Sequence, residues 1–234
     1  LNAWTGYGTF SLTVPNLPPA PHIDVAQFGW ALAIGLAAAV VSFGIKWLAL
    51  FLRPHVERRL LLLTPVAGLA IAGLAIAFAE ATGKPSSDVL FSGQTALTPL
   101  LENAASYTVG TLVLLIVCKG LAYSISLSSF RGGPTFPGMF LGAAGGIALS
   151  HLPGLPMIAG AAIGIGAMTA GMLQLPITAV LLTTLFLGAD GIATMPLVIV
   201  AVVVSFVLSK WLAGPPPEPT VPEPEEATVP PQVR

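Results

Sequence analysis

Charged residues are scarce in this sequence of 234 residues. Asp, Glu, Lys and Arg together make up only 8% of it, whereas 55% of the residues are hydrophobic and the mean hydropathy is +0.88. About a quarter of the residues of a soluble globular domain are charged. The chain therefore lacks the polar cover that a water-soluble protein needs, and its composition predicts an integral membrane protein.

Residues that would support catalysis or metal binding are scarce as well. The single cysteine, Cys118, lies in an apolar run, so a disulfide within the chain is excluded. The histidines lie in polar connections or in a proline-rich turn, away from any cysteine or glutamate cluster, and indicate no metal site; they are His22, His55 and His151. No Ser/His/Asp arrangement, phosphate loop or zinc-binding helix is present. We therefore expect neither an enzyme nor a bound cofactor.

The two ends of the chain lack the long apolar runs of its middle. Residues 215–234 contain eight prolines, four glutamates and no aromatic residue, a composition that cannot bury enough surface to fold. We predict a disordered tail over 213–234, an extramembrane segment over 1–27 and a membrane domain over 28–212. The opening residues carry no basic stretch followed by an apolar core, so we expect no signal peptide there. Because the chain starts with Leu1 rather than Met, we expect a fragment or a processed product.

Long apolar runs dominate the membrane domain. Four of them approach the ~20 residues that a helix needs to cross the bilayer: 28–51, 60–79, 104–127 and 191–209. The first two are separated by a polar hairpin over 53–59 that contains three arginines, which places it on the cytoplasmic side by the positive-inside rule. Lys210, at the end of the last run, indicates the same side. Residues 80–102 are more polar and indicate a connection or a short re-entrant piece.

Residues 132–189 contain no Asp, Glu, Lys or Arg and are broken by prolines. The pieces 137–150 and 176–189 would form helices of about 21 Å, shorter than the ~30 Å hydrocarbon core, and 157–173 would reach about 26 Å. Helices that end at membrane depth are tolerated only where their ends are buried in protein or line a watery cavity. Two G-x-x-x-G pairs favour close helix packing: Gly142 with Gly146, and Gly160 with Gly164.

The stretch SFRGGPTFPGMFLGAAGG, residues 129–146, joins a glycine loop to a helix. Pro137 suits the first turn of that helix, where its missing N–H has no intrahelical partner. Gly132 and Gly133 permit a tight backbone with positive φ. The start of such a helix presents free N–H groups and the positive end of the helix dipole, which can hold an anion weakly enough to release it. The stretch indicates an anion path, and a packing kink is the alternative.

The same stretch resembles the third signature, GGxFxP, of the CLC family of chloride channels and chloride/proton antiporters. Further segments follow in the order of that family's C-terminal half: AQFGWALAIGLAAAVVSFGIKWL (26–48), SGQTALTPL (92–100), TLVLLIVCKGLAYSISL (111–127) and GMLQLPITAVLL (171–182). The resemblance covers roughly residues 10–211. It implies an all-α integral membrane bundle of tilted, partly broken helices, built from two inverted halves. It also implies a homodimer in the cell membrane, with chloride as the transported ligand and an anion pathway within each subunit.

In that family, backbone amides just after the paired glycines help to coordinate the central anion. The corresponding positions here are Pro134, which has no N–H, and Thr135, and the family's phenylalanine is shifted to Phe136. We therefore expect Thr135 and Phe136 to bind the ion. The full set of candidate anion-binding residues is Gly132, Gly133, Thr135, Phe136 and Pro137.

Two basic side chains are candidates for attracting the anion. Arg131 stands beside the glycines, where it would draw anions toward a vestibule. Lys119 lies inside an apolar run, where a lysine is costly unless it is paired or near water. It either sets a positive potential along the anion path or is a structural residue bonded to nearby carbonyls.

Three departures from the family pattern stand out. The first two signatures, which supply a coordinating serine and the gating glutamate, are not found, and the final helix with the coordinating tyrosine is missing. An acidic residue often seen late in the helix ITAVLLTTLF is apolar here, near Leu185. The chain is therefore expected to need a missing N-terminal half for a complete pore. Asp190 fits a turn before the last helix.

Other functions stay open at this point. A transporter of the same architecture could carry another anion, such as fluoride or nitrate. A non-conducting membrane scaffold or partner subunit is an alternative of a different class, in which Pro134 marks a decayed site. An enzyme within the membrane is the weakest alternative, because no paired catalytic residues are present.

Overall fold

The computed structural model describes residues 24–130 and 132–214. Within these ranges the regular structure is helical and no strand is found, which confirms the predicted all-α fold. The helices are α2 (Val25–Arg58), α3 (Leu60–Thr82), η1 (Ser86–Asp88), α4 (Gln94–Glu102), η2 (Ala104–Ser106), α5 (Val109–Ser129), α6 (Thr135–Ser150), α7 (Met157–Leu173), α8 (Pro176–Leu187) and α9 (Ala189–Ala213). Most of the predicted N-terminal segment, Arg131 and the predicted tail from residue 215 lie outside the described residues.

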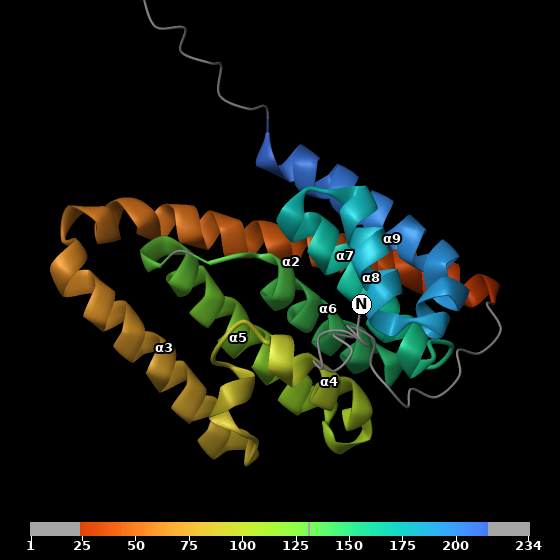
Figure 1. Ribbon diagram of the computed structural model, residues 1–234, viewed down its shortest axis with the longest axis horizontal. Coiled ribbons are helices and arrows are strands. Elements are labelled where there is room, and N and C mark those ends of the chain that lie inside the picture. Colours follow the sequence, from red (N-terminus) through yellow and green to blue (C-terminus); the bar gives the residue numbers. More distant parts are fainter. Residues whose placement is uncertain (1–23, 131, 215–234) are drawn as a thin grey trace, which may run out of the picture.

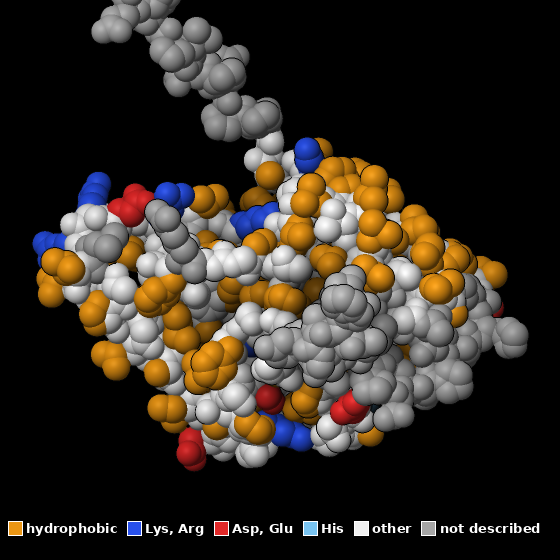
Figure 2. Space-filling view, viewed as in Figure 1, with side chains coloured by type: hydrophobic (Ala, Val, Ile, Leu, Met, Phe, Trp, Pro, Cys, Tyr) orange, Lys and Arg blue, Asp and Glu red, His pale blue; other side chains and the backbone are white. Residues whose placement is uncertain are grey.

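Four helices are long and apolar enough to cross a membrane: α2, α3, α5 and α9. They coincide with the four predicted runs, so the prediction of a multi-pass membrane protein is confirmed. The surface agrees with this assignment, because Figure 2 shows hydrophobic side chains along the outer faces of α3 and α9. On α3, the side chain of Leu61 is 90% exposed and that of Leu69 is 73% exposed.

Helix α2 continues through the predicted polar hairpin, so the hairpin predicted over 53–59 was wrong in extent. The chain turns only at Arg59, whose N–H donates to the carbonyl of Val56 at 3.2 Å. The preceding residues favour a helix because Arg53 Nε and Glu57 Oε1, one turn apart, form an ion pair of 2.7 Å. With 34 residues, α2 is about 51 Å long and exceeds the ~30 Å hydrocarbon core.

The predicted short helices are also present. Helices α6, α7 and α8 have 16, 17 and 12 residues, which correspond to about 24, 26 and 18 Å and fall short of the bilayer core. Helix α7 is buried from Ile158 to Met172, and α6 and α7 lie in the middle of the molecule (Figure 1). Asp190 belongs to α9 rather than to a turn before it, because the break falls at Gly188, where φ is 61°.

Helices α6 and α7 pack with their backbones in contact through four glycines. A Cβ atom on Gly146 would overlap the carbonyl group of Gly160, and one on Gly142 would overlap that of Gly164. In the reverse direction, a Cβ on Gly160 would lie 2.6 Å from the carbonyl oxygen of Gly146. Both predicted G-x-x-x-G pairs therefore form one interface, in which only glycine lets the two helices approach this closely.

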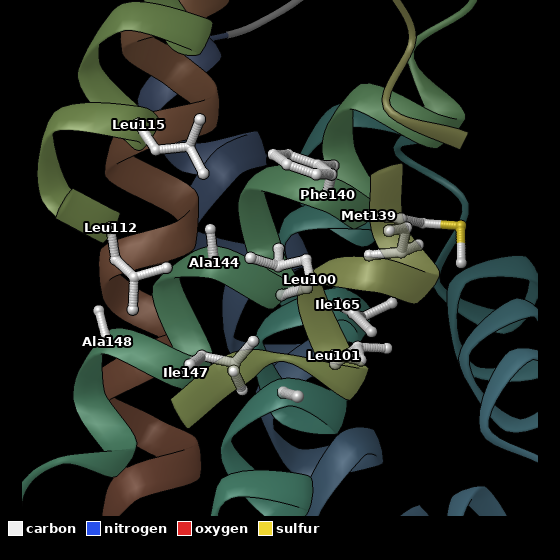
Figure 3. Packing of buried hydrophobic residues seen from close by; sticks show 14 of the residues in the cluster. Leu100, Leu101, Leu112, Leu115, Met139, Phe140, Ala144, Ile147, Ala148 and Ile165 are labelled. Atoms are coloured by element: carbon white, nitrogen blue, oxygen red, sulfur yellow. The ribbon is translucent and has the colours of Figure 1, made fainter. Parts of the chain in front are cut away.

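Large apolar side chains surround this pair of helices. In Figure 3, Leu112 and Leu115 of α5 face the side of α6 that carries Ala144 and Ala148. Leu100 and Leu101 of α4 join the same cluster and are almost completely buried (Figure 3). The polar segment between α3 and α5 therefore contains a short helix that is anchored in the core. Residues 80–102 were expected to be a connection or a short re-entrant piece, and the choice between the two stays a prediction.

The substitution Gly146→Ala tests the contact between α6 and α7. The added methyl group must push the two backbones apart, and we expect a loss of about 1–3 kcal/mol in the free energy of unfolding. The measurement is thermal unfolding of the purified protein in detergent. Gly145→Ala is the matched control, because a Cβ there meets its nearest neighbour, Ile116 Cδ1, at 3.9 Å. Equal stability of the two variants would contradict the proposed interface.

Candidate functional site

Two prolines shape the N-terminus of α6, which we call its head. Pro134 is the N-cap, with φ −84° and ψ −9°, and the helix begins at Thr135, two residues before the predicted start. The first backbone bond of the helix is donated by the N–H of Gly138 to the carbonyl of Pro134 at 3.0 Å. Pro137 falls in the first turn, as predicted, where its missing N–H breaks no helical bond.

Two backbone donors are left at this head. The N–H groups of Thr135 and Phe136 have no acceptor within the helix, as expected for its first residues. Among the described residues, no backbone carbonyl or side chain accepts from either of them. Both residues are half-buried. The head therefore presents two free N–H groups together with the positive end of the helix dipole.

The paired glycines do not use the positive-φ backbone that glycine permits, and their part in anion binding stays a prediction. Neither Gly132 nor Gly133 has a positive φ, and a Cβ on either would meet no atom within 4 Å. The chain leaves α5 in an extended conformation at Phe130, with φ −126° and ψ 160°. The hydroxyl of Tyr123 donates to the carbonyl of Gly133 at 3.4 Å and ties the loop to α5.

A cavity of about 120 Å³ lies beside the head of α6. Pro137 forms part of its wall, and three polar side chains of α5 also line it: Lys119, Tyr123 and Ser126. Since one water occupies about 30 Å³ in the liquid, the cavity has room for a few waters or for a small ion. The sequence analysis missed Tyr123 and Ser126, although hydroxyl groups one turn and two turns beyond Lys119 in an apolar helix were a signal.

Lys119 is buried and fully used in bonds to the backbone. Its side chain is 1% exposed, and its Nζ donates to the carbonyl oxygens of Asp88 at 2.7 Å, Val89 at 3.3 Å and Leu90 at 3.2 Å. The same Nζ lies 4.4 Å from the centre of the Phe140 ring on α6. These are the bonds that the structural interpretation of Lys119 expects. Its contribution to the potential along an anion path stays a prediction.

The segment that Lys119 binds is held by a second buried contact. Asp88 Oδ2 accepts a hydrogen bond of 3.0 Å from the hydroxyl of Tyr107. Burial, and secondarily the negative charge of Asp88, raise the pKa of Tyr107 to about 12, so the phenol stays protonated and remains a donor. The bonds from Lys119 and the bond from Tyr107 thus both hold the 88–90 segment in place.

The remaining predicted residues lie apart from this site. Arg131 is outside the described residues, so its prediction stands as made. His151 lies at the end of α6, where its Nδ1 is 3.0 Å from the carbonyl oxygen of Ile147, in agreement with a turn residue. Leu185 is on α8 with 58% of its side chain exposed. Within the described ranges, no group of three His, Cys, Asp or Glu residues could hold a metal ion.

Comparison with known protein families identifies the family to which the chain belongs. The family model described as voltage gated chloride channel matches residues 3–210, which is most of the chain. The chain belongs to this family. The resemblance seen in the glycine-proline stretch is therefore confirmed, and so is the CLC-like membrane fold.

Curated relatives of the chain are described as ion-transport proteins. YfeO, to which ion transport is ascribed, is 28% identical over 148 residues in Escherichia coli O1:K1, in Escherichia coli K12 strain DH10B and in Shigella boydii serotype 18. The match covers 63% of this chain and 34% of each relative. The chain thus spans about a third of the length of these relatives. No solved structure gives a significant match.

The substitution Lys119→Met tests the clamp between α5 and the 88–90 segment. It leaves three carbonyls without their shared donor in a buried place, and each unsatisfied group costs about 1–3 kcal/mol. We expect a large drop in the thermal unfolding midpoint in detergent. Arg53→Met is the control, because its ion pair is exposed and worth at most about 1 kcal/mol. Similar midpoints for both variants would show that the three bonds do not stabilise the fold.

Proposed function

We propose that this protein transports a small anion, with chloride as the leading ion, and that the anion binds at the head of α6. The observation that carries the proposal is the pair of unbonded N–H groups on Thr135 and Phe136. They belong to a helix of 16 residues, shorter than the hydrocarbon core, and they precede Pro137, which lines a largely apolar cavity whose wall also includes Lys119, Tyr123 and Ser126. Membership of the voltage-gated chloride channel family supports the same conclusion.

The chemistry of the head favours an anion over a cation. Its groups are donors and partial positive charges, and the sequence has no Asp or Glu between Gly132 and Ala189 that could hold a cation. Lys119 adds a full charge in the wall of the neighbouring cavity. Because its ammonium group donates to three carbonyls, Lys119 makes the electrostatic potential near the proposed site more positive without binding the ion directly.

The number of donors makes the proposed site weak. Pro134 and Pro137 have no N–H, so two of the first four positions at the head offer nothing to an anion. Conduction requires binding that is favourable enough for entry and weak enough for exit. A head with two amides and no direct ionic contact meets that requirement.

The complete pore is proposed to need more than this chain. The chain spans about a third of the relatives' length, and α3 presents a long exposed apolar face. In the proposal, an N-terminal half supplies the other wall of the pathway and the protein works as a homodimer in the cell membrane. No cofactor takes part, and the anion is the ligand.

Replacing Phe136 by phenyllactic acid tests the amide directly. This change turns the backbone N–H into an ester oxygen and leaves the side chain as it is. A hydrogen bond to a charged group contributes about 1.5–3 kcal/mol, so we expect chloride affinity of the full-length protein to fall roughly ten- to a hundredfold. Affinity is measured by titration calorimetry, and flux by chloride efflux from proteoliposomes.

Phenyllactic acid at Phe130 is the matched control for that experiment. It makes the same chemical change six residues earlier, where the N–H donates to the carbonyl of Ser126 at 2.7 Å and ends α5. Stability should fall and chloride affinity should not. Unchanged affinity in the Phe136 ester would contradict the proposed site.

The substitution Pro134→Ala should strengthen the site. It restores an N–H at the N-cap, and we expect anion affinity to rise by up to about tenfold. The measurement is the anion-dependent rise in the unfolding midpoint, with chloride, fluoride and nitrate compared. Pro156→Ala, at the N-cap of α7, is the control. If no anion stabilises either the parent protein or Pro134→Ala, the non-conducting scaffold is the better conclusion.

A further inference from the structure

A second cavity, which we call the basic cavity, lies away from the head of α6. Its volume is about 570 Å³, and its wall includes Lys46 and Trp47 of α2, Gly171 near the end of α7, and Lys210 near the end of α9. None of its lining residues belongs to α6 or to the loop before it. It is therefore separate from the proposed anion path.

Three helices run in the same direction toward this cavity. The hydroxyl of Ser205 on α9 donates to the carbonyl of Ala167 on α7 at 2.7 Å, and the hydroxyls of Ser42 and Ser209 are 3.5 Å apart. Gly35, earlier on α2, lies against Ala201, earlier on α9. The C-terminal ends of α7 and α9 therefore meet the second half of α2 on one side of the molecule.

The basic cavity has a net positive charge among the described residues. Lys46 Nζ donates to the carbonyl of Gly171 at 2.7 Å, which uses one of its three N–H bonds. Lys210 is exposed, with its Nζ 5.4 Å from the Phe206 ring. Among the described residues, no Asp or Glu lines the cavity and no carboxylate lies within 4.0 Å of either lysine. Two helix C-termini contribute about −0.5 each, so the two lysines leave about one net positive charge.

Aromatic residues mark the level of the membrane surface here. Trp47 is 57% exposed and stacks on Phe51 at 5.7 Å, and Trp211 is 77% exposed next to Lys210. Tryptophan favours the boundary between lipid and water. Figure 2 shows basic side chains along the upper edge, over the junction of α2 with α3 and over the end of α9. By the positive-inside rule this is the cytoplasmic side.

We propose that the basic cavity binds the phosphate group of an anionic phospholipid from the cytoplasmic leaflet. Lys46 and Lys210 hold the phosphate, and the exposed apolar side chains of Trp47 and Leu50 beside them contact the acyl chains. A ligand with one charged end and one apolar part uses both surfaces, whereas a soluble anion uses only the lysines. Basic pockets between helices on this side of a membrane are suited to anionic headgroups.

The test is lipid binding to the full-length protein in nanodiscs, with the retained phosphatidylglycerol measured against phosphatidylcholine by native mass spectrometry. The double variant Lys46→Gln/Lys210→Gln should lose preference for phosphatidylglycerol by roughly ten- to thirtyfold. Lys84→Gln is the matched control, because it removes the same charge beyond the far end of α3, where the lysine binds Ser106. Equal preference in the parent protein and the double variant overturns the proposal.

A single-lysine variant and a competition with inorganic phosphate complete the test. Lys46 also holds the end of α7, so the double variant could misfold. In that case Lys210→Gln is tested alone, because among the described residues the Lys210 side chain makes no hydrogen bond or ion pair and lies only over the Phe206 ring. A several-fold loss in that variant supports the proposal, and no loss overturns it. Inorganic phosphate is titrated as a competitor. If it displaces the lipid as effectively as soluble phosphatidylglycerol does, the cavity is a site for a soluble anion and the lipid proposal is wrong.

Discussion

The contact between the backbones of α6 and α7 is the constraint on which the other features depend. Glycines on both helices let carbonyl groups of one lie against the Cα atoms of the other. Hydrocarbon offers no water to unpaired backbone groups, so helices shorter than the bilayer persist only inside protein. Here α2, α5 and α9 surround the pair, and leucines of α4 and α5 fill the gaps (Figures 1 and 3). The residues that carry the free N–H groups, Thr135 and Phe136, are half-buried in this packing.

Among the described residues, the ammonium groups of Lys119 and Lys46 are hydrogen-bonded to carbonyl oxygens rather than to carboxylates. Lys119 binds three carbonyls of the 88–90 segment, and Lys46 binds one at the end of α7. A carbonyl satisfies an ammonium group without cancelling its charge. Near Lys119 the buried carboxylate of Asp88 offsets part of that charge, whereas no described carboxylate lies within 4.0 Å of Lys46 or Lys210. The two cavities differ in their surroundings, since only the second opens next to exposed tryptophans.

The loop before α6 matches the family signature in sequence, but its glycines do not take a backbone conformation that requires glycine. Gly132 and Gly133 match the family pattern, yet neither has positive φ and neither touches a neighbour that would exclude a side chain. The restriction comes instead from Pro134 and Pro137, which set where the helix begins and how many donors it offers. The proposed binding strength therefore depends on the prolines more than on the glycines.

The sequence by itself determined the membrane class, the four spans, the three short helices and the glycine pairs. These features depend on local composition and on segment length against a bilayer of fixed thickness. It misjudged the extent of α2, which continues as a helix through the polar stretch, where an exposed i,i+4 ion pair adds a small stabilisation. Only the tertiary structure decided which carbonyls Lys119 meets, that Tyr123 reaches Gly133, and that Lys46 and Lys210 share a cavity. These partners are ten or more residues apart along the chain, so the path of the loops and the packing of the helices decide whether they meet.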